Sequence, residues 1–307
     1  MSYVPAPTLR RLDHRRSVSA RRSRTAWFFL APSLITLALF MVWPMVQSLY
    51  FSFTDYNRIQ AARWVGLDNY AELLGDSNVW NALGNTALYT AVVTPVTVAL
   101  ALAAALYLNN AMAFRGFTRT ALFLPFVVSL GIIGIAFSFL MDPNIGLVSH
   151  WLSKIGIVSE QGFLSDPKLA MGTVMVVGVW KNVGFYMVMY LAGLQSIPEE
   201  LHEASRLDGA NTFQRFRNVT WPLLSNQTML ICILAATASL QAFDQIFVMT
   251  HGGPYFKTET LVMLIYRSGF SELRLGYGAA ISWVLMLLVF ALSMIQVGYF
   301  RKKAVTY

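Results

Sequence analysis

The feature that most constrains this chain is a set of six long apolar windows that contain almost no charged residues. A helix needs about 20 apolar residues to cross the hydrocarbon core of a bilayer, and each window reaches that length. The windows cover about 26–53, 85–108, 120–141, 169–194, 221–243 and 275–300. The sequence therefore predicts an all-α polytopic membrane protein with six transmembrane helices.

The composition also indicates a lipid environment. Of the 307 residues, 56% are apolar and only 12% are charged, whereas soluble domains carry about 25% charged residues. Such a composition excludes a disordered chain over most of the length. Prolines occur inside several windows, and a helix bundle tolerates them because neighbouring helices satisfy the freed carbonyl groups.

The positions of the basic residues predict the orientation. An even number of spans puts both termini on one side of the membrane, and that side carries 15 Lys and Arg residues against 7 on the other. The positive-inside rule makes that side cytoplasmic. We therefore expect a multi-pass protein of the cytoplasmic (inner) cell membrane, with a basic cytoplasmic tail at 1–25. The basic residues behind the net charge of +8 are then explained by the orientation in the membrane and by contact with lipid head groups. We therefore expect no nucleic-acid partner.

Enzyme chemistry is disfavoured by what the sequence lacks. The dipeptide Gly-Lys never occurs, so there is no phosphate loop for a nucleotide. The four histidines lie outside the windows, and there is no H-E-x-x-H motif. A single cysteine, Cys232, allows neither an internal disulfide nor a cysteine metal site. We expect no catalytic residue, no metal site and no cofactor in this chain.

The segment 197–217, between the fourth and fifth windows, is strongly charged. Seven of the nineteen residues from Glu199 to Arg217 carry a charge, so this segment cannot cross a bilayer. A domain of transmembrane helices over 26–303 with this segment as a cytoplasmic helix-turn-helix is the predicted organisation. An ordinary amphipathic loop under the bundle is the alternative.

Local signals in this segment predict where its helices begin and end. Ser196 and Glu199 fit a capping box at the start of the first helix. Gly209 fits a helix stop that needs a positive φ. Asn211 or Thr212 can cap the second helix.

The same segment carries a recognisable motif. The runs Glu203-Ala204-Ser205 and Asp208-Gly209-Ala210, followed by Trp221-Pro222, resemble the EAA loop of permease subunits of binding-protein-dependent ABC importers. Ser205 replaces the usual third Ala of the motif, and Trp221 replaces the usual Leu. Further stretches are similar to the sugar-type branch, which includes maltose and glycerol-3-phosphate permeases: 66–70, 180–182, 184–185 and 250–254.

The resemblance implies a transmembrane permease that forms half of a translocation pore. The matching positions Glu203, Ala204, Asp208 and Gly209 would dock onto a separate ATPase. The implied partners are two ATP-binding-cassette ATPase subunits, which bind ATP and Mg, a second related permease and an extracytoplasmic solute-binding protein. The expected solute is a carbohydrate or sugar-like molecule, and glycerol 3-phosphate or a glycerophosphodiester is the alternative. A self-sufficient secondary transporter, the alternative from another class, would need ionisable residues in several spans.

Polar residues at membrane depth are candidates for the solute pathway. Lys181 lies about 12 residues into the fourth window, roughly 18 Å deep, and an intramembrane charge is a functional candidate by default. The other candidates are Asn182, Ser239, Gln241 and Asp244. The alternatives are that Lys181 binds carbonyl groups between helices and that Asp244, with Gln245, begins a solvated loop. A direct ion pair between Lys181 and Asp244 is disfavoured in straight helices, because Asp244 is expected at the outer interface.

Overall fold

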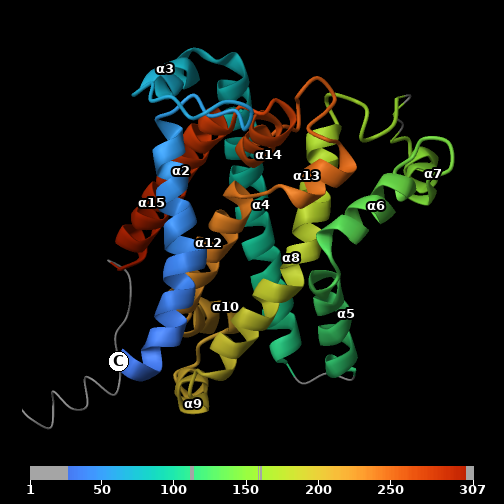
Figure 1. Ribbon diagram of the computed structural model, residues 1–307. Helices are drawn as coiled ribbons and strands as arrows, with labels where there is room; N and C mark the ends of the chain where they lie inside the picture. Colours follow the sequence, from blue (N-terminus) through green and yellow to red (C-terminus); the bar gives the residue numbers. More distant parts are fainter. Residues whose placement is uncertain (1–26, 111–113, 158, 160, 302–307) are drawn as a thin grey trace, which may run out of the picture.

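The computed structural model describes residues 27–110, 114–157, 159 and 161–301. Over these ranges the chain is helical and forms no β-strand, apart from one isolated bridge between Thr54 and Trp64. The predicted basic tail at 1–25 lies outside the described residues. Figure 1 shows a bundle whose long helices run between two ends, which we name the α3 end and the α9 end after the short helices that lie there.

Five helices are long and apolar enough to cross a membrane, and a bent pair makes a sixth candidate span. Each of the five matches a predicted window, and the second begins earlier than predicted, at Ser77 instead of 85. The five helices cover Trp27–Ser52, Ser77–Asn109 (α4), Ala170–Gln195 (α8), Ser225–Met249 and Leu275–Phe300. The first contains the π-helical turn η1 (Ala38–Val42) and α2 (Trp43–Ser52), and the last belongs to α15 (Leu275–Arg301).

The third window, predicted as one helix over 120–141, is broken. Helix α5 covers Arg115–Val127 and α6 covers Leu130–Leu140, and the two are bent by 97°. Val128 and Ser129 between them are extended. Pro125 has no N–H to donate to the preceding turn, which weakens the end of α5. The third predicted span is therefore a bent pair of helices instead of one straight helix.

The fifth window, predicted as one helix over 221–243, is also interrupted. It consists of α11 (Trp221–Leu223), α12 (Ser225–Leu240) and, after a break at 241–243, α13 (Asp244–Met249). Asp244 therefore starts a half-helix instead of ending a span. A carboxylate is favourable there because the first turn of a helix carries a partial positive charge.

Shorter helices lie between the spans. At the α3 end are α3 (Asp68–Gly75), α7 (Leu147–Lys154), α14 (Leu261–Tyr266) and the π-helical turn η3 (Arg267–Ser271). At the α9 end are α9 (Glu199–Leu207), α10 (Thr212–Arg215) and η2 (Phe216–Thr220).

The helix-turn-helix over 197–217 is confirmed, but one of its caps is not. Ser196 belongs to the last turn of α8 and donates from Oγ to the Gly193 carbonyl over 2.8 Å. Helix α9 begins at Glu199, and its N-cap is Pro198, without a side-chain cap, so the predicted Ser196–Glu199 capping box is wrong. Asn211 caps α10 in a capping box with Gln214.

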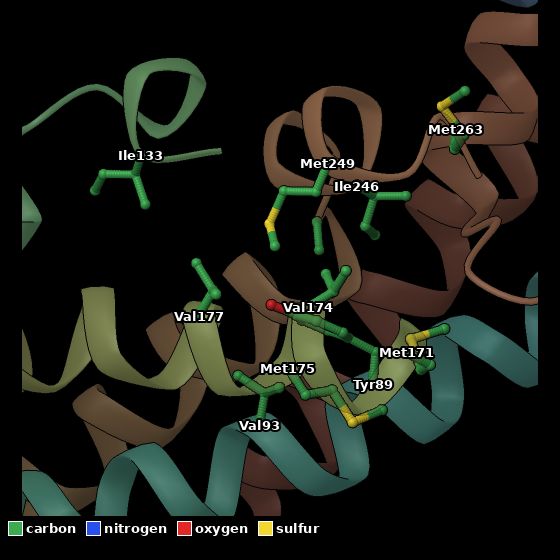
Figure 2. Close-up of a cluster of buried hydrophobic side chains, with 11 residues drawn as sticks. Tyr89, Val93, Ile133, Met171, Val174, Met175, Val177, Ile246, Met249 and Met263 are labelled. Atoms are coloured by element: carbon green, nitrogen blue, oxygen red, sulfur yellow. The ribbon is translucent and has the colours of Figure 1, made fainter. Parts of the chain in front are cut away.

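The buried core lies along α4 and α8. One cluster joins these two helices to α13: Figure 2 shows Val174 and Val177 of α8 near Ile246 and Met249 of α13, with Tyr89 of α4 beside them. A second cluster joins α4, α8 and α12 nearer the α9 end. A third joins α3, α4, α14 and α15 at the α3 end. The first cluster places the breaks of the third and fifth spans next to α8.

Candidate functional site

A cavity of about 120 Å³ lies beside the break between α12 and α13. Four of the five residues predicted for a solute pathway line it, although they come from distant parts of the chain. These residues are Asn182 of α8, Ser239 of α12, Gln241 in the break and Asp244 at the start of α13. Helix α4 supplies the opposite wall, and Leu130 of α6 reaches the cavity as well.

The polar groups of the cavity are mostly neutral hydroxyls and amides. Thr94 Oγ1 donates to Ser239 Oγ over 3.1 Å, which joins α4 to α12. Asn182 Nδ2 donates to the Gly178 carbonyl over 2.8 Å, and the buried Thr97 hydroxyl has no hydrogen-bond partner among the described residues. Such walls can exchange hydrogen bonds with a hydroxyl-rich molecule.

Sequence reasoning missed the contribution of α4, which brings Tyr89, Thr94 and Thr97 to the cavity. A signal was present, because Thr90, Thr94 and Thr97 recur at helical spacing and form a polar stripe in an apolar span. Gln245 was also misjudged as part of a solvated loop start. Its side chain is 4% exposed and donates from Nε2 to the Tyr89 hydroxyl.

Lys181 is buried on α8 and, unlike its neighbour Asn182, does not line the cavity. Its Nζ donates to the carbonyl oxygens of Phe126 and Val128, each over 2.9 Å, and to that of Pro125 over 3.4 Å. These carbonyls lie at the broken end of α5. No carboxylate in the described part of the chain forms an ion pair with Lys181, in line with the expectation that it does not bridge to Asp244.

The four residues predicted to contact an ATPase lie together at the α9 end. Glu203 and Ala204 are exposed on α9, and Asp208 and Gly209 follow at its C-terminal end. Gly209 has a φ of +78°, which confirms the predicted positive φ. Leu207, between these pairs, is 89% exposed. An exposed charged helix with an exposed Leu at its C-terminal end is suited to docking on another protein.

Polar contacts fasten the loops at the α3 end. Arg267 forms a bidentate ion pair with the buried Glu259 and also contacts Glu272. At the start of α4, burial raises the pKa of Asp76, but hydrogen bonds from Tyr277 and from Asn78 outweigh burial and leave the pKa lowered from its ordinary value. These loops therefore form a connected surface at the end of the bundle opposite α9.

Comparison with known families decides what this bundle is. Residues 97–305 match the family described as "Binding-protein-dependent transport system inner membrane component". The chain belongs to this family. The prediction of a permease of the binding-protein-dependent ABC importers is therefore confirmed, and the family is one of transport permeases and not of enzymes.

Curated relatives of this permease cover nearly the whole chain. The sn-glycerol-3-phosphate transport system permease protein UgpA of Agrobacterium fabrum is 33% identical over 90% of this chain and 94% of its own length. The lactose transport system permease protein LacF of Rhizobium radiobacter is 34% identical over 88% of this chain and 92% of its own length. A probable starch degradation products permease, AmyD of Thermoanaerobacterium thermosulfurigenes, is 31% identical over 91% and 94%.

A solved structure shares the fold. A chain of a bacterial alginate ABC transporter, crystallised with an alginate pentasaccharide-bound periplasmic protein, superposes with a TM-score of 0.83. The identity is 21%, and the match covers 94% of this chain and 98% of that chain. The all-α polytopic fold predicted from the six windows is thus confirmed.

Proposed function

We propose that this permease forms half of the translocation pore for a neutral carbohydrate or sugar-like solute in an ATP-driven importer. The cavity beside the break between α12 and α13 is the observation that carries the proposal. Asn182, Ser239, Gln241 and Asp244 converge on it with the hydroxyls of α4. Relatives named for lactose and for starch degradation products support the same solute class.

A phosphorylated solute such as glycerol 3-phosphate, or a glycerophosphodiester, is the second candidate, because UgpA is a relative of similar identity. The cavity favours the neutral solute. Among the described residues, no Lys or Arg lines the cavity, and Asp244 contributes a carboxylate to it. A carboxylate repels a phosphate, and little solvent screens that repulsion inside a protein.

The exposed α9 surface supports the proposed coupling to ATP hydrolysis. Glu203, Ala204, Asp208 and Gly209 would fit into a partner ATPase, one of two such subunits. ATP and Mg would bind to those subunits, so this chain would need no cofactor. The α9 end would then face the cytoplasm, with both termini, and the α3 end would face a solute-binding protein outside.

A second, related permease would complete the pore. The span Trp27–Ser52 supports this part of the proposal, because none of its most apolar stretch is buried within the chain. Lipid and a second permease would cover that surface together. The assembly would sit in the cytoplasmic (inner) cell membrane.

The test is solute uptake by the complete complex. The permease is reconstituted in proteoliposomes with its second permease, ATPase subunits and binding protein, and uptake of maltose, lactose and sn-glycerol 3-phosphate is compared. We expect uptake of a neutral sugar, and we expect Gln241→Ala and Asp244→Asn each to lower it about tenfold. Gln241→Ala removes hydrogen bonds to the solute, and Asp244→Asn replaces a charged acceptor oxygen by an amide donor, which forms weaker hydrogen bonds.

Asp55→Asn is the matched control, because Asp55 is an exposed carboxylate outside the cavity. It should leave uptake unchanged. Uptake of glycerol 3-phosphate alone would contradict the proposed solute class. Unchanged uptake in both cavity variants would contradict the proposed site.

A further inference from the structure

The break in the third span leaves backbone carbonyls without helical partners, and a residue far along the chain donates hydrogen bonds to them. A helix end leaves backbone carbonyls without partners inside the helix, and such groups are costly at membrane depth because no water is there to donate hydrogen bonds to them. Helix α5 ends at Val127, and the next helix turns away by 97°. The freed carbonyls therefore need donors from another part of the chain.

Lys181 supplies those donors. Its ammonium group reaches three carbonyls at the end of α5, those of Pro125, Phe126 and Val128. The C-terminal end of a helix carries a partial negative charge, which a cation offsets. The ammonium also lies 5.3 Å from the centre of the Phe126 ring, and Lys181 is 6% exposed. Three carbonyl dipoles and a ring face thus stabilise this charge, and no carboxylate among the described residues forms an ion pair with it.

This contact lies between two walls of the cavity. Asn182, the next residue on α8, lines the cavity directly. Leu130, at the start of α6, lines it from the other side of the break and is two residues beyond the Val128 carbonyl that Lys181 binds. Lys181 itself contributes no wall. A donor at this position fixes where α6 begins relative to α8.

Helix α6 also packs closely on α13, so the contact between Lys181 and the end of α5 affects the position of α13 as well. A Cβ at Gly134 of α6 would lie only 2.9 Å from Val248 of α13, so the two half-helices are in tight contact. The direction of α6 therefore affects α13, which begins with Asp244. A change at the Lys181 contact would reach both Leu130 and Asp244.

We infer that Lys181 is a positioning residue for transport: it holds the broken end of α5 and thereby sets α6 against the solute cavity. The inference rests on the proposed function of that cavity. It differs from the expectation that Lys181 contacts the solute itself, because the side chain acts through the backbone at 125–128. The two roles predict different outcomes when the charge is removed.

The decisive measurement is the distance between α5 and α6 in the assembled complex. Spin labels replace Phe117 on α5 and Phe139 on α6, which are 75% and 62% exposed, in a Cys232→Ser background in lipid nanodiscs. Pulsed electron paramagnetic resonance then gives the distance distribution. We expect Lys181→Met, which keeps the stem and removes the donors, to shift or broaden it, and Lys181→Arg to preserve it. Lys168→Met is the control, because Lys168 is exposed just before α8.

Uptake is measured on the same variants without spin labels. We expect Lys181→Met to lower uptake about tenfold or more, since small misplacements of binding groups have effects of that size, and Lys181→Arg to restore most of it. If the Lys181→Met complex does not assemble, Lys181→Gln is measured in its place. Its shorter amide keeps two N–H donors but bears no charge, so we expect a smaller change in the distance and a smaller loss of uptake than removal of all donors would give.

Three outcomes would overturn the inference. Lost uptake with an unchanged distance would assign Lys181 to direct solute contact, and a changed distance with normal uptake would show that the position of α6 is irrelevant to transport. An unchanged distance with normal uptake would show that Lys181 has no role in positioning α6 or in transport. The distance does not depend on which solute is carried, so failure of the proposed solute class would leave this part of the test intact.

Discussion

At the scale of single residues, Gly209 has a backbone conformation that favours glycine over residues with a Cβ. Its φ of +78° is costly for residues with a Cβ, by about 1–2 kcal/mol. A Cβ there would meet no other atom within 4 Å, so the cost is conformational and not steric. We expect Gly209→Val to abolish the ATPase activity that solute and binding protein stimulate, because the turn between α9 and α10 would change direction.

Gly209→Asn is the informative comparison, since Asn adopts positive φ more readily than Val does. It should retain a large part of the stimulated ATPase activity of the reconstituted complex. A pull-down of the ATPase subunits accompanies the activity measurement. Equal activity and equal retention in Gly209→Val and the unmodified permease would contradict a coupling role for this turn.

At the scale of helices, α5 and α8 approach each other backbone to backbone at Gly184. A Cβ at this position would overlap the Leu122 carbonyl group of α5. Close approach through small residues is the usual basis of helix packing in membranes. We expect Gly184→Ala to push the two helices apart and to destabilise the permease by roughly 1–3 kcal/mol, measured as a lower thermal unfolding midpoint in detergent.

Gly172→Ala provides a control on the same helix. A Cβ at Gly172 would meet nothing within 4 Å, and alanine favours the helix by up to about 1 kcal/mol over glycine. Its unfolding midpoint should equal or exceed that of the unmodified protein. Equal midpoints for the Gly172 and Gly184 variants would mean that the α5–α8 approach is not tight.

At the scale of the whole molecule, the bundle presents different chemistry at its two ends. The α9 end carries the exposed charged helix, and the α3 end carries loops fastened by ion pairs. The orientation proposed from the basic residues predicts that these ends lie on opposite sides of the membrane. We expect Ile59→Cys to react with a membrane-impermeant thiol reagent from outside, and Leu207→Cys to react only in inverted vesicles.

Both positions are well exposed in the permease alone, at 79% and 89%. The labelling therefore uses the permease without its ATPase subunits, so that access depends on topology and not on burial by a partner. The Cys232→Ser background removes the native thiol, and the unsubstituted background is the labelling control. Labelling of Ile59→Cys from the cytoplasmic side alone would reverse the proposed orientation.

Local chemistry determined much of this protein, and the sequence was enough to predict that part. Six apolar windows fix the number of candidate spans, because only segments of that length satisfy their backbone inside a bilayer. The positive φ of Gly209 and the cap at Asn211 follow from residue preferences within a few positions. The resemblance of short motifs to permeases of ABC importers predicted the family, and the match over residues 97–305 shows it.

Tertiary structure decided what depends on residues far apart in the sequence. The end of α5 near Val127 is stabilised by Lys181, more than 50 positions later in the chain. The cavity needs α4, α8 and the break at 241–243 together, so Thr94 and Ser239 show their role only once they are in contact. A freed carbonyl or a buried hydroxyl must find its partner wherever the fold supplies one, and periodicity along one segment carries no information about that partner.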